Sequence, residues 1–498
     1  MADHKFKIAY IGAGSFRFSI GLFKNIIAAT ELFPFEVALV DIDAKSLDIM
    51  TRILKHMVKK ADAKVTVTST MNRREALENA DFLYKSISVG IQKAEWFDIH
   101  VPYKFGIPQN TGDTCGPGGL FRGLRCVPQV AAIARDMKEL CPKAVLLNYT
   151  NPQATIVMGA RRVDPDLQYI GLCHELFGGA GAVRKAATML GKSIENWQDM
   201  DIEYGGINHY AWFTSIKYKG EDLYPLLREN VDKFIAGGDR VFNWYLMKKY
   251  GWFPYPGSRH VAEFMPEYYN AFNNVLHSKP PFKFPALRDV YMLDKARRGA
   301  YLGFKLMAGI LGPWLVPKAT KRGEKALDMT IDWKNNDPKH HVVNLPNKGY
   351  IPNLPEDAVV EIPGYFKDGK MVGVKVGPLP EVVANFVRPH AEQQFLTVDA
   401  ALGNSPELVV KAMLHDPMNR FIEDDDAIED LTYSMLYHEQ EWLPPEWKEW
   451  IPKKEDLLKR KRYVDASDIK GVSRARKIKY PIDPRLEAKA FKCDAQPL

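Results

Sequence analysis

The sequence predicts an α/β protein in which a doubly wound parallel sheet is followed by an α+β domain. Up to about residue 200, short apolar segments of strand length alternate with longer amphipathic segments, as in a parallel sheet that helices cover on both faces. The first apolar segment, residues 7–11, runs into a glycine-rich turn and then into a helical pattern. Beyond Trp212 the helical patterns lengthen and the strands become less regular, which indicates a second domain.

Length and composition are those of an ordinary globular chain. The 498 residues suffice for two or three domains, and 46% of them are hydrophobic and 26% charged. The sequence shows no secretion signal and no apolar run that could span a bilayer. The five cysteines have no CxxC spacing, which argues against a disulfide framework and fits a reducing cytoplasm. Because the net charge of +7 is modest, neither nucleic acid nor a membrane is an expected partner.

Three parts are expected along the chain. Residues 1–200 would form a Rossmann-type NAD-binding domain, residues 201–450 an α+β substrate and catalytic domain, and residues 451–498 a basic C-terminal extension. The extension lacks strong periodicity, so we expect it to pack on the surface or on another subunit rather than bind nucleic acid. A homodimer or homotetramer is expected.

The turn after the first strand has the residues of a dinucleotide site. Its residues are Gly12, Gly14, Ser15 and Phe16, with Arg17 in place of the third glycine of the usual pattern. Backbone N–H groups at the start of the following helix would receive a pyrophosphate. The next strand, residues 35–40, ends in Asp41, whose carboxylate would accept hydrogen bonds from the ribose and repel a 2′-phosphate. We therefore expect NAD rather than NADP.

A glycine-rich stretch over residues 113–125 reads as a loop or a helix entry. Its Asp113, Arg122 and Arg125 are side chains that can hold hydroxyls and anions. The strand and helix alternation continues on either side of it, with strands at 65–68 and 80–88 and a helix at 127–140.

Three polar clusters each end or follow a short apolar run, so each is expected at the carboxyl end of a strand, where open α/β sheets bind ligands. The clusters are residues 148–152, 171–175 and 206–212. Taken singly, Cys173 and His209 would more often be inert core residues. Together, without another cysteine nearby, they indicate a thiolate and an imidazole that bind a divalent metal. The neighbouring residues expected to face a substrate are Asn151, His174 and Asn208.

The second domain offers a further polar group. Residues 253–264 read as a turn that leads into a helix, with Arg259 and His260 at its start. Residues 344–380 are rich in strand signals, and residues 389–416 are again helical.

Together these residues resemble glycoside hydrolase family 4, the NAD- and manganese-dependent glycosidases, whose fold is related to lactate and malate dehydrogenases. The resemblance extends from Lys7 to about Pro417 and is closest to the α-galacturonidase and α-glucosidase branch. It rests on the order of the motifs Gly12-Ala13-Gly14-Ser15, Asp41, Val89-Gly90, Gly116-Pro117-Gly118-Gly119, Asn151-Pro152, Cys173-His174, Asn208-His209 with Trp212, and the block 347–363.

The resemblance implies the roles of several residues. Cys173 and His209 would be the metal ligands, and Asn151 would contact sugar hydroxyls beside the metal. Asp113 would face the substrate, and Val89 would contact the cofactor. In the chemistry of this family, NAD+ takes a hydride from sugar carbon 3 and the metal polarises the ketone. A base then removes the carbon 2 proton, the aglycone leaves by elimination, water adds and the hydride returns, so the net reaction is hydrolysis.

Two departures from the family pattern bear on the substrate and the base. Members that act on 6-phosphosugars carry an arginine where this chain has Ser88, so a phosphorylated substrate is disfavoured. In the α-glycosidase branches an aspartate proposed as the base stands at the position of Ser258. Serine is too weak a base unaided. The catalytic candidates are therefore Asp113, Tyr255 and His260, unless the activity differs from the family norm.

The segment 116–125 and the pair Arg259-His260 most resemble the α-galacturonidase branch. Arginine suits a bidentate grip on a carboxylate, so Arg122 and Arg259 favour an α-linked hexuronide, galacturonide before glucuronide. The alternative for both arginines is that they brace loops or a subunit interface. Other functions that stay open are an α-glucosidase, α-galactosidase or α-glucuronidase of the same family, a plain NAD-dependent hydroxy-acid or polyol dehydrogenase, and, because of Ser258, a cofactor-bound protein without activity.

Overall fold

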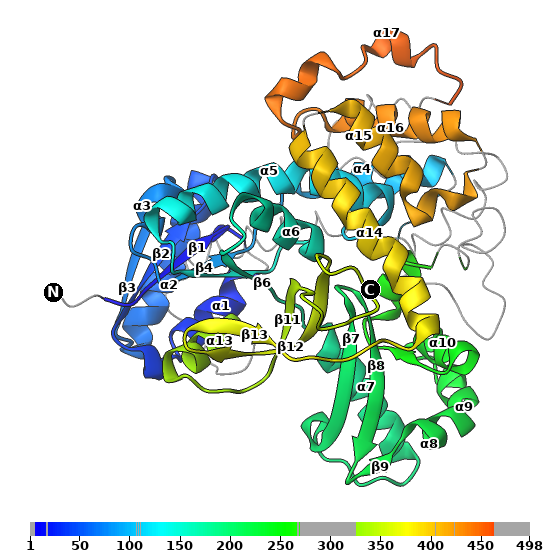
Figure 1. Ribbon diagram of the computed structural model, residues 1–498. Coiled ribbons are helices and arrows are strands. Elements are labelled where there is room, and N and C mark those ends of the chain that lie inside the picture. The colour runs from blue at the N-terminus through cyan, green and yellow to red at the C-terminus, as the bar shows by residue number, and fades with distance from the viewer. Residues whose placement is uncertain are drawn as a thin grey trace.

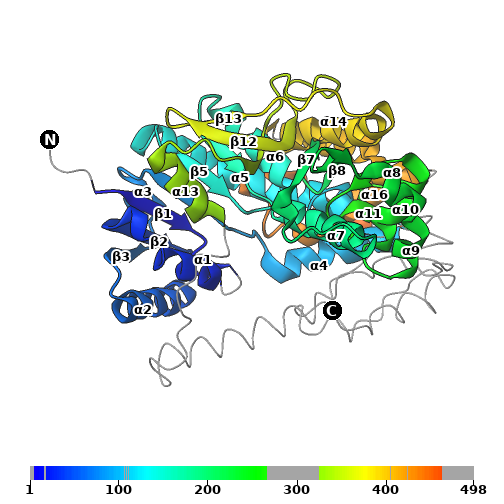
Figure 2. The ribbon, with the colours of Figure 1, turned by 90° about the horizontal axis from the view of Figure 1, so that it is seen from below.

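The computed structural model describes residues 5–265 and 325–462 together with Tyr268, apart from Phe16, Arg17, Gly106, Pro108, Asn110, Asn404 and Glu423. The strands of these residues form one mixed sheet of 13 strands. Helices lie on both faces of its N-terminal half, and a further layer of helices lies beside the sheet (Figures 1 and 2).

The N-terminal half of the sheet is parallel, in the order β3-β2-β1-β4-β5-β6. Its strands are β1 (Lys7–Ile11), β2 (Phe35–Val40), β3 (Val65–Thr70), β4 (Phe82–Lys85), β5 (Val145–Asn148) and β6 (Gln168–Gly171). The chain reverses direction across the sheet between β1 and β4, which is the topology of a doubly wound dinucleotide-binding fold. The predicted fold class is confirmed.

Both faces of these strands are buried, which explains their continuous apolar sequences. In β1, Ile8 and Tyr10 face one side with Phe23, while Ala9 and Ile11 face the other side. The first side is covered by α1 (Ser19–Ile26) and α2 (Ala44–Ala61), and the second by α3 (Arg73–Leu77), α5 (Gly116–Leu140) and α6 (Gln153–Val163). Complete burial of one such side chain stabilises the fold by about 1.5–3 kcal/mol, so the two layers hold the parallel half firmly.

The C-terminal half of the sheet is antiparallel and continues from β6 in the order β11-β12-β7-β8-β10, with β13 on β12 and β9 on β8. These strands are β7 (Met200–Ile207), β8 (Tyr210–Tyr218), β9 (Glu221–Asp222), β10 (Phe253–Pro254), β11 (His341–Pro346), β12 (Val359–Lys367) and β13 (Lys370–Gly373). The expected boundary near residue 200 coincides with the start of β7. The sheet nevertheless runs across it, and the domain limits stay a prediction.

Two joins in the sheet are short, one between its two halves and one within the antiparallel half. Gly171 of β6 pairs with Asn344 of β11, and Gly206 of β7 pairs with Glu361 of β12. Asn344 and Glu361 also pair with each other between β11 and β12. In the described chain each join is therefore one residue pair long, and Asn344 contributes to one join and Glu361 to the other.

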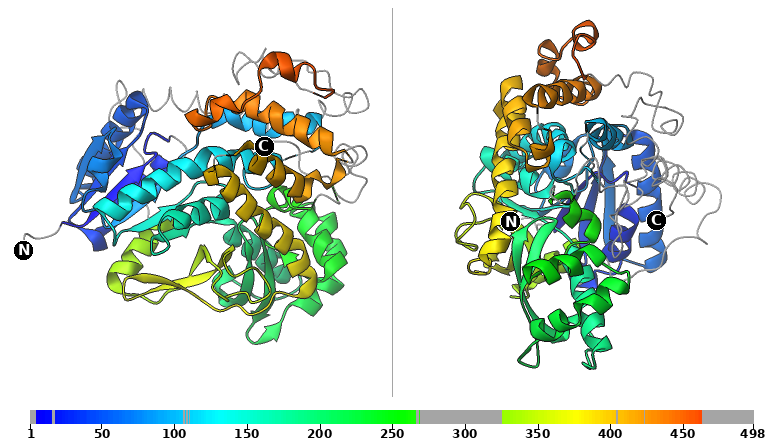
Figure 3. Two further views of the ribbon diagram at one scale, coloured as in Figure 1. Left: turned by 45° about the horizontal axis from the view of Figure 1, so that its top comes forward. Right: turned by 90° about the vertical axis from the view of Figure 1, so that its right-hand side faces the viewer.

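Helices from distant parts of the sequence form the layer beside the sheet (Figure 3). Its members are α4 (Ile91–Lys104), α5, α14 (Glu381–Gly403), α15 (Pro406–His415) and α16 (Asp425–Glu439). The sequence patterns indicated a helix only from residue 127, but α5 begins at Gly116 and absorbs the glycine-rich stretch. A Cβ on Gly118 would lie 2.5 Å from the carbonyl oxygen of Asp98, so a glycine is required where α5 crosses α4. The helix α4 was not predicted.

The remaining described helices flank the antiparallel strands or the chain end. They are α7 (Glu175–Met189), α8 (Tyr224–Glu229), α9 (Val231–Ala236), α10 (Val241–Tyr250), α11 (Ser258–Glu263), α13 (Lys325–Asn335) and α17 (Lys454–Leu457), with 3-10 turns η1 (Thr30–Leu32), η2 (Trp197–Asp199), η5 (Pro417–Phe421) and η6 (Pro445–Glu449). Among these described helices, none combines the length and the apolar character needed to cross a bilayer. Cys115, Cys126, Cys141 and Cys173 are free thiols, and Cys493 lies outside the described residues.

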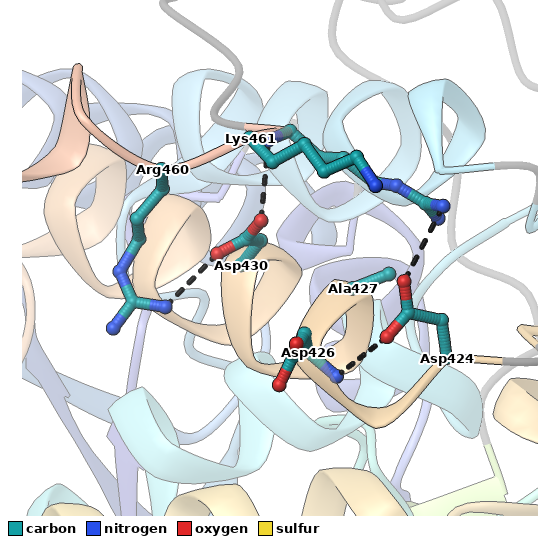
Figure 4. Close-up of a pocket in the computed structure, with 7 residues that line it drawn as sticks. Asp424, Asp426, Ala427, Asp430, Arg460 and Lys461 are labelled. Atoms are coloured by element: carbon teal, nitrogen blue, oxygen red, sulfur yellow. Dashed lines mark hydrogen bonds and ion pairs between the residues drawn. The ribbon is translucent and has the colours of Figure 1, made fainter.

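The described part of the basic C-terminal extension lies on α16, where a small pocket forms between the two (Figure 4). Arg460 pairs with Asp430 at 2.9 Å, and the guanidinium of Arg462 lies 3.4 Å from the Asp424 carboxylate. The backbone N–H of Arg462 also donates to Asp430. Because these ion pairs are partly exposed, each contributes at most about 1 kcal/mol. They attach the start of the extension to the surface, and residues 463–498 lie outside the described residues.

Candidate functional site

The turn after β1 has the close backbone packing of a nucleotide site. Gly12 has a φ of +93°, and a Cβ there would lie 2.0 Å from the carbonyl oxygen of Ser86, so only glycine fits. The carboxylate of Asp41 accepts the N–H of Gly14 at 2.8 Å and that of Asp43 at 2.9 Å. These bonds fix the carboxylate at the end of β2, with lone pairs left for ribose hydroxyls.

The other predicted cofactor residues lie around the same edge. The N–H of Ser15 donates to the carbonyl of Gly12 at 3.1 Å, which closes the turn. Val89 follows β4 and is half-buried beside Gly90, which begins α4 with a φ of +78°. Phe16 lies outside the described residues. The structure thus brings Gly12, Gly14, Ser15, Asp41 and Val89 to the carboxyl edge of the parallel strands.

The three polar clusters of the sequence also meet at strand ends. Asn148 ends β5 and Cys173 follows β6, and these two strands pair directly through Asn148 and Gly171. Asn208 and His209 form the tight turn between β7 and β8, where His209 adopts a left-handed φ of 64°. Left-handed backbone is uncommon for a residue with a side chain and is frequent at functional sites.

Three metal-ligating side chains converge at this place. One donor atom each of Asp113, His209 and His260 lies within 4.8 Å of the other two. The Asp113 and His209 side chains are buried, and the ring centroids of His209 and His260 are 3.9 Å apart. A carboxylate and two imidazoles are a donor set that suits a divalent first-row metal.

Hydrogen bonds of Thr114 define the tautomer of His209. The Thr114 hydroxyl donates to Asp113 at 2.6 Å and lies 2.9 Å from His209 Nδ1. Because its single proton goes to the carboxylate, the hydroxyl oxygen accepts the proton of Nδ1, which leaves the lone pair on Nε2. Burial, and then His260, lower the pKa of His209 to about 3, so the ring is neutral near pH 7. His209 is thus prepared as a metal ligand, as metal-bound histidines are.

Cys173 does not belong to that group of three. Burial raises the pKa of its thiol well above the usual range, the nearby carboxylates of Glu361 and Glu175 raise it further, and a contact with the Asn208 amide lowers it. The thiol would ionise only with a cation beside it, which a metal supplies. Metal binding by Cys173 remains a prediction.

The Asn208 side chain supports the fit of a metal. Its Nδ2 donates to Glu361 at 2.9 Å, while its buried Oδ1 has no hydrogen-bond partner in the described part of the chain. A buried carbonyl oxygen without a partner needs a donor or a cation. It lies in the same turn as His209.

The predicted substrate residues differ in how they are held. Arg122 donates to the carbonyl oxygen of Asn151 at 3.1 Å and lies 3.4 Å from the Ser88 hydroxyl. The amide nitrogen of Asn151 in turn lies 3.4 Å from the Asp113 carboxylate. Asn151 thus connects Arg122 with the group of metal-ligating side chains. The His174 side chain is 85% exposed. Arg259 lies in the first turn of α11, next to His260, and is half-buried.

Arg125 is not an anion-binding residue of this site, contrary to the sequence-based expectation. Its side chain is 1% exposed and pairs bidentately with Asp98 at 2.9 and 2.8 Å. It also pairs with Glu439 of α16. The guanidinium therefore links helix α5 to helices α4 and α16 by buried ion pairs, and a substrate does not reach it.

Ser258, at the start of α11, and Tyr255, just before that helix, both donate hydrogen bonds to other side chains and are not free to act as bases. The Ser258 hydroxyl donates to Asn243 at 2.5 Å. The fully buried Tyr255 hydroxyl donates to Glu361 at 2.5 Å, and burial followed by the Glu361 charge raises the Tyr255 pKa well above its usual range. Of the three catalytic candidates, Asp113 and His260 therefore lie in the donor group and Tyr255 lies behind it.

Sequence reasoning missed Thr114, Glu361 and Asn344. Thr114 had no distinguishing pattern, because its role comes from its two neighbours in space. Glu361 had a signal: it is the single charged residue in the apolar run Val359–Pro363, at a position that faces a core.

Two family models match the chain: family 4 glycosyl hydrolase over residues 7–189, and the C-terminal domain of family 4 glycosyl hydrolase over residues 204–419. An α-galacturonidase from Thermoanaerobacter italicus is 32% identical over 458 residues, which are 88% of this chain and 97% of that protein. An α-galactosidase from Bacillus subtilis is 31% identical over 418 residues, 82% of this chain and 93% of that protein.

A solved structure shows the same fold over most of both chains. It is a 6-phospho-α-glucosidase from gut microorganisms in complex with NAD and Mn2+, with a TM-score of 0.72 and 22% sequence identity. The match covers 88% of this chain and 99% of that one.

Proposed function

Since the chain belongs to family 4 of the glycosyl hydrolases, we propose that it hydrolyses α-linked hexuronides, galacturonides before glucuronides, with NAD+ and a divalent metal. Family membership makes the chain a glycosidase. The sugar, the anomer and the assignment of residues to roles are our proposal, and they rest on the site described above.

Two groups of residues would hold the cofactors. The turn with Gly12, Gly14 and Ser15, the Asp41 carboxylate and Val89 would hold NAD+ at the carboxyl edge of the parallel strands. Mn2+, or another divalent ion, would lie among His209, Asp113, His260 and the Cys173 thiol. When bound, NAD+ would supply a reversible hydride acceptor for sugar carbon 3, and the metal a Lewis acid for its oxygen.

The chain's own residues would then handle the proton on carbon 2. Asp113 and His260 are the candidates for the base, because they lie in the donor group and Tyr255 is occupied by Glu361. Asn151 would orient the sugar hydroxyls next to Asp113. Two divisions of labour fit: Cys173 and His209 bind the metal and His260 is the base, or His260 completes the metal site and Asp113 is the base.

Mn2+ binding distinguishes the two. In the first arrangement Cys173→Ser weakens Mn2+ binding strongly and His260→Ala leaves it nearly unchanged, and in the second the order is reversed. Electron paramagnetic resonance of free Mn2+ measures both without any substrate.

Arg122 is the observation that supports an anionic substrate. Its guanidinium contacts a carbonyl and a hydroxyl, and no carboxylate of the described residues pairs with it. Below it, at the end of β4, Lys85 is fully buried, and its Nζ has no hydrogen-bond partner in the described chain. Burial, and then repulsion by Arg122, lower the pKa of Lys85 to about 7. Lys85 is therefore charged only in part near pH 7, and the Arg122 guanidinium supplies the positive charge that a carboxylate of the sugar would balance.

The relatives include enzymes named for a uronide and for a neutral sugar. The α-galacturonidase cited above shares most of its length with this chain, and Ser88 stands where phosphosugar members have an arginine. The α-galactosidase is almost as similar, so similarity alone does not choose between a uronide and a neutral galactoside.

The test is kcat/KM for nitrophenyl α-galacturonide, α-galactoside and α-glucoside, with NAD+, Mn2+ and a reductant that keeps Cys173 reduced. We expect the galacturonide to be preferred by about 10²-fold or more, the scale of a buried cation left unpaired by a neutral sugar. Arg122→Met and Arg259→Ala should each remove most of this preference.

The matched control is Arg388→Ala, since Arg388 bonds to Asn353 and Glu381, away from the site. A wild-type preference for a neutral glycoside would overturn the uronide assignment. So would equal losses on acidic and neutral substrates in both arginine variants. Stoichiometric NADH release without aglycone release would indicate a dehydrogenase instead.

A further inference from the structure

A buried carboxylate connects the elements that carry the site. Glu361 lies in β12, and its side chain is completely buried. It occupies one of the two short joins in the sheet, opposite Gly206 of β7. None of the roles proposed above includes it.

Three neutral groups donate hydrogen bonds to Glu361. Asn208 and Asn344 each place an Nδ2 at 2.9 Å from Oε2, and the Tyr255 hydroxyl lies 2.5 Å from Oε1. The two amides and the phenol all direct a donor at the carboxylate, and this arrangement fits its ionised form. Burial raises the pKa of Glu361, and the three hydrogen bonds oppose that effect.

No cationic side chain of the described residues balances this charge. Its hydrogen-bond partners are two amides and a phenol, and a buried carboxylate is unfavourable unless a positive charge lies near it. Glu361 is close enough to Cys173 and Tyr255 to raise the pKa of both. The negative charge of Glu361 thus lies close enough to attract a cation bound beside Cys173.

Glu361 also fixes the geometry of the donors. Asn208, which it holds, precedes His209 and touches the Cys173 thiol. Asn344, the second amide, lies 3.4 Å from the carbonyl oxygen of Gly171, two residues before Cys173. Tyr255 begins the segment that leads to His260. One carboxylate therefore links the three chain segments that present Cys173, His209 and His260.

We propose that Glu361 is a positioning residue of the metal site, which orients Asn208 and supplies a buried negative charge that increases metal affinity without touching the metal. This inference rests on the proposed metal-dependent function. Part of the affinity for Mn2+ would then come from a residue that is not itself a ligand of the metal.

The test is the dissociation constant of Mn2+ alone, measured by electron paramagnetic resonance on the full chain without NAD+ or sugar. Glu361→Gln keeps the shape and removes the charge. We expect it to bind Mn2+ about 10–100-fold more weakly than the wild type, the usual effect of a lost partner of a metal ligand. Its activity should return toward the wild-type value when Mn2+ is raised to saturation. Glu361→Asp keeps the charge and should bind Mn2+ more tightly than Glu361→Gln.

The matched control is Asp332→Asn, because Asp332 is a buried carboxylate that faces His341 at 2.9 Å at the far end of β11. It should leave Mn2+ affinity unchanged. A folded Glu361→Gln with wild-type Mn2+ affinity would show that Glu361 is only structural and overturn the inference. A wild type that does not bind Mn2+ would instead overturn the metal-dependent function.

A second variant keeps the test decisive if Glu361→Gln does not fold. Asn344→Leu removes one of the two amides on Oε2 and leaves the metal-facing side chains in place. We expect Mn2+ affinity to fall severalfold, because Glu361 and with it Asn208 lose a fixed position. Unchanged affinity in folded Asn344→Leu would contradict the proposal.

Discussion

Glu361 and Glu439 are both completely buried, but the surroundings of the two carboxylates differ. Glu439 of α16 shares the guanidinium of Arg125 with Asp98 of α4, so its charge is met by a cation of the protein itself. Glu361 at the join of the sheet has only neutral donors. The difference teaches how to separate a structural cluster from a functional one: the first contains a cation of the protein, and the second would gain a cation only from a ligand.

The largest effect is expected from substitutions of the side chains that would bind the metal. His209→Ala should reduce Mn2+-dependent hydrolysis by about 10³-fold or more, because the metal stabilises charge on the reacting oxygen. Cys173→Ser should do the same in the arrangement in which Cys173 binds the metal. NAD+ binding, measured by calorimetry, should be nearly unchanged in both variants.

Cys141→Ser is the matched control for the thiol, since Cys141 is a free, buried cysteine at the end of α5. It should retain activity. Loss of NAD+ affinity with unaltered metal dependence in the His209 or Cys173 variant would contradict the metal assignment.

The next effect concerns the buried ion pairs of Arg125 with Asp98 and Glu439. Arg125→Met leaves Asp98 and Glu439 without their cation, and removal of one partner of a buried ion pair typically destabilises by about 3–5 kcal/mol. We expect a clear fall in the denaturant midpoint of unfolding. Mn2+ affinity of the folded fraction should not change.

Arg162→Met provides the comparison for a surface pair, because Arg162 meets Asp399 at 3.3 Å with both side chains about half exposed. Its effect should stay within about 1 kcal/mol. A weaker Mn2+ affinity in Arg125→Met would show that the two regions are coupled and weaken the comparison.

The smallest effect is expected for Asp41, a carboxylate that differs from both Glu361 and Glu439. Asp41 is held by backbone amides of Gly14 and Asp43 rather than by side chains. Asp41→Ala should weaken NAD+ binding about tenfold, the scale of a hydrogen bond to a charged group, and reduce the discrimination against NADP+. Fluorescence titration with both cofactors measures it.

Asp48→Ala on the exposed face of α2 is the control and should alter neither affinity. An unchanged ratio of NAD+ to NADP+ affinity in Asp41→Ala would refute its role in cofactor choice.

Much of the parallel half was predictable because its signals are local. Gly12, Gly14 and Asp41 lie close together in sequence, and each is recognisable from its place after a strand. The strand-end positions of Asn151, Cys173 and His209 were predictable for the same reason. That Asn151 and Cys173 lie at one edge follows from the rule that parallel strands end together, whereas His209 comes from the turn between the antiparallel strands β7 and β8.

The partners of these residues were not predictable, since they depend on contacts between distant segments. Asn208 and Glu361 are 153 positions apart, and Arg125 and Glu439 are 314 apart. Arg122 and Arg125 lie within one turn of α5, yet one reaches the site and the other does not. The neighbouring element determines whether each arginine reaches the site. Arg122 faces the loops after β4 and β5, whereas Arg125 faces helices α4 and α16.

The short joins of the sheet have a consequence for motion. Gly171 pairs with Asn344 and Gly206 with Glu361, and a join of one residue pair opens at a lower free energy than a long ladder. Because Glu361 accepts hydrogen bonds from both Asn208 and Asn344, we expect breathing of the sheet at these joins to loosen the turn of Asn208 as well. A ligand that binds only the closed form would suppress this breathing and slow amide exchange in strands on both sides of the joins.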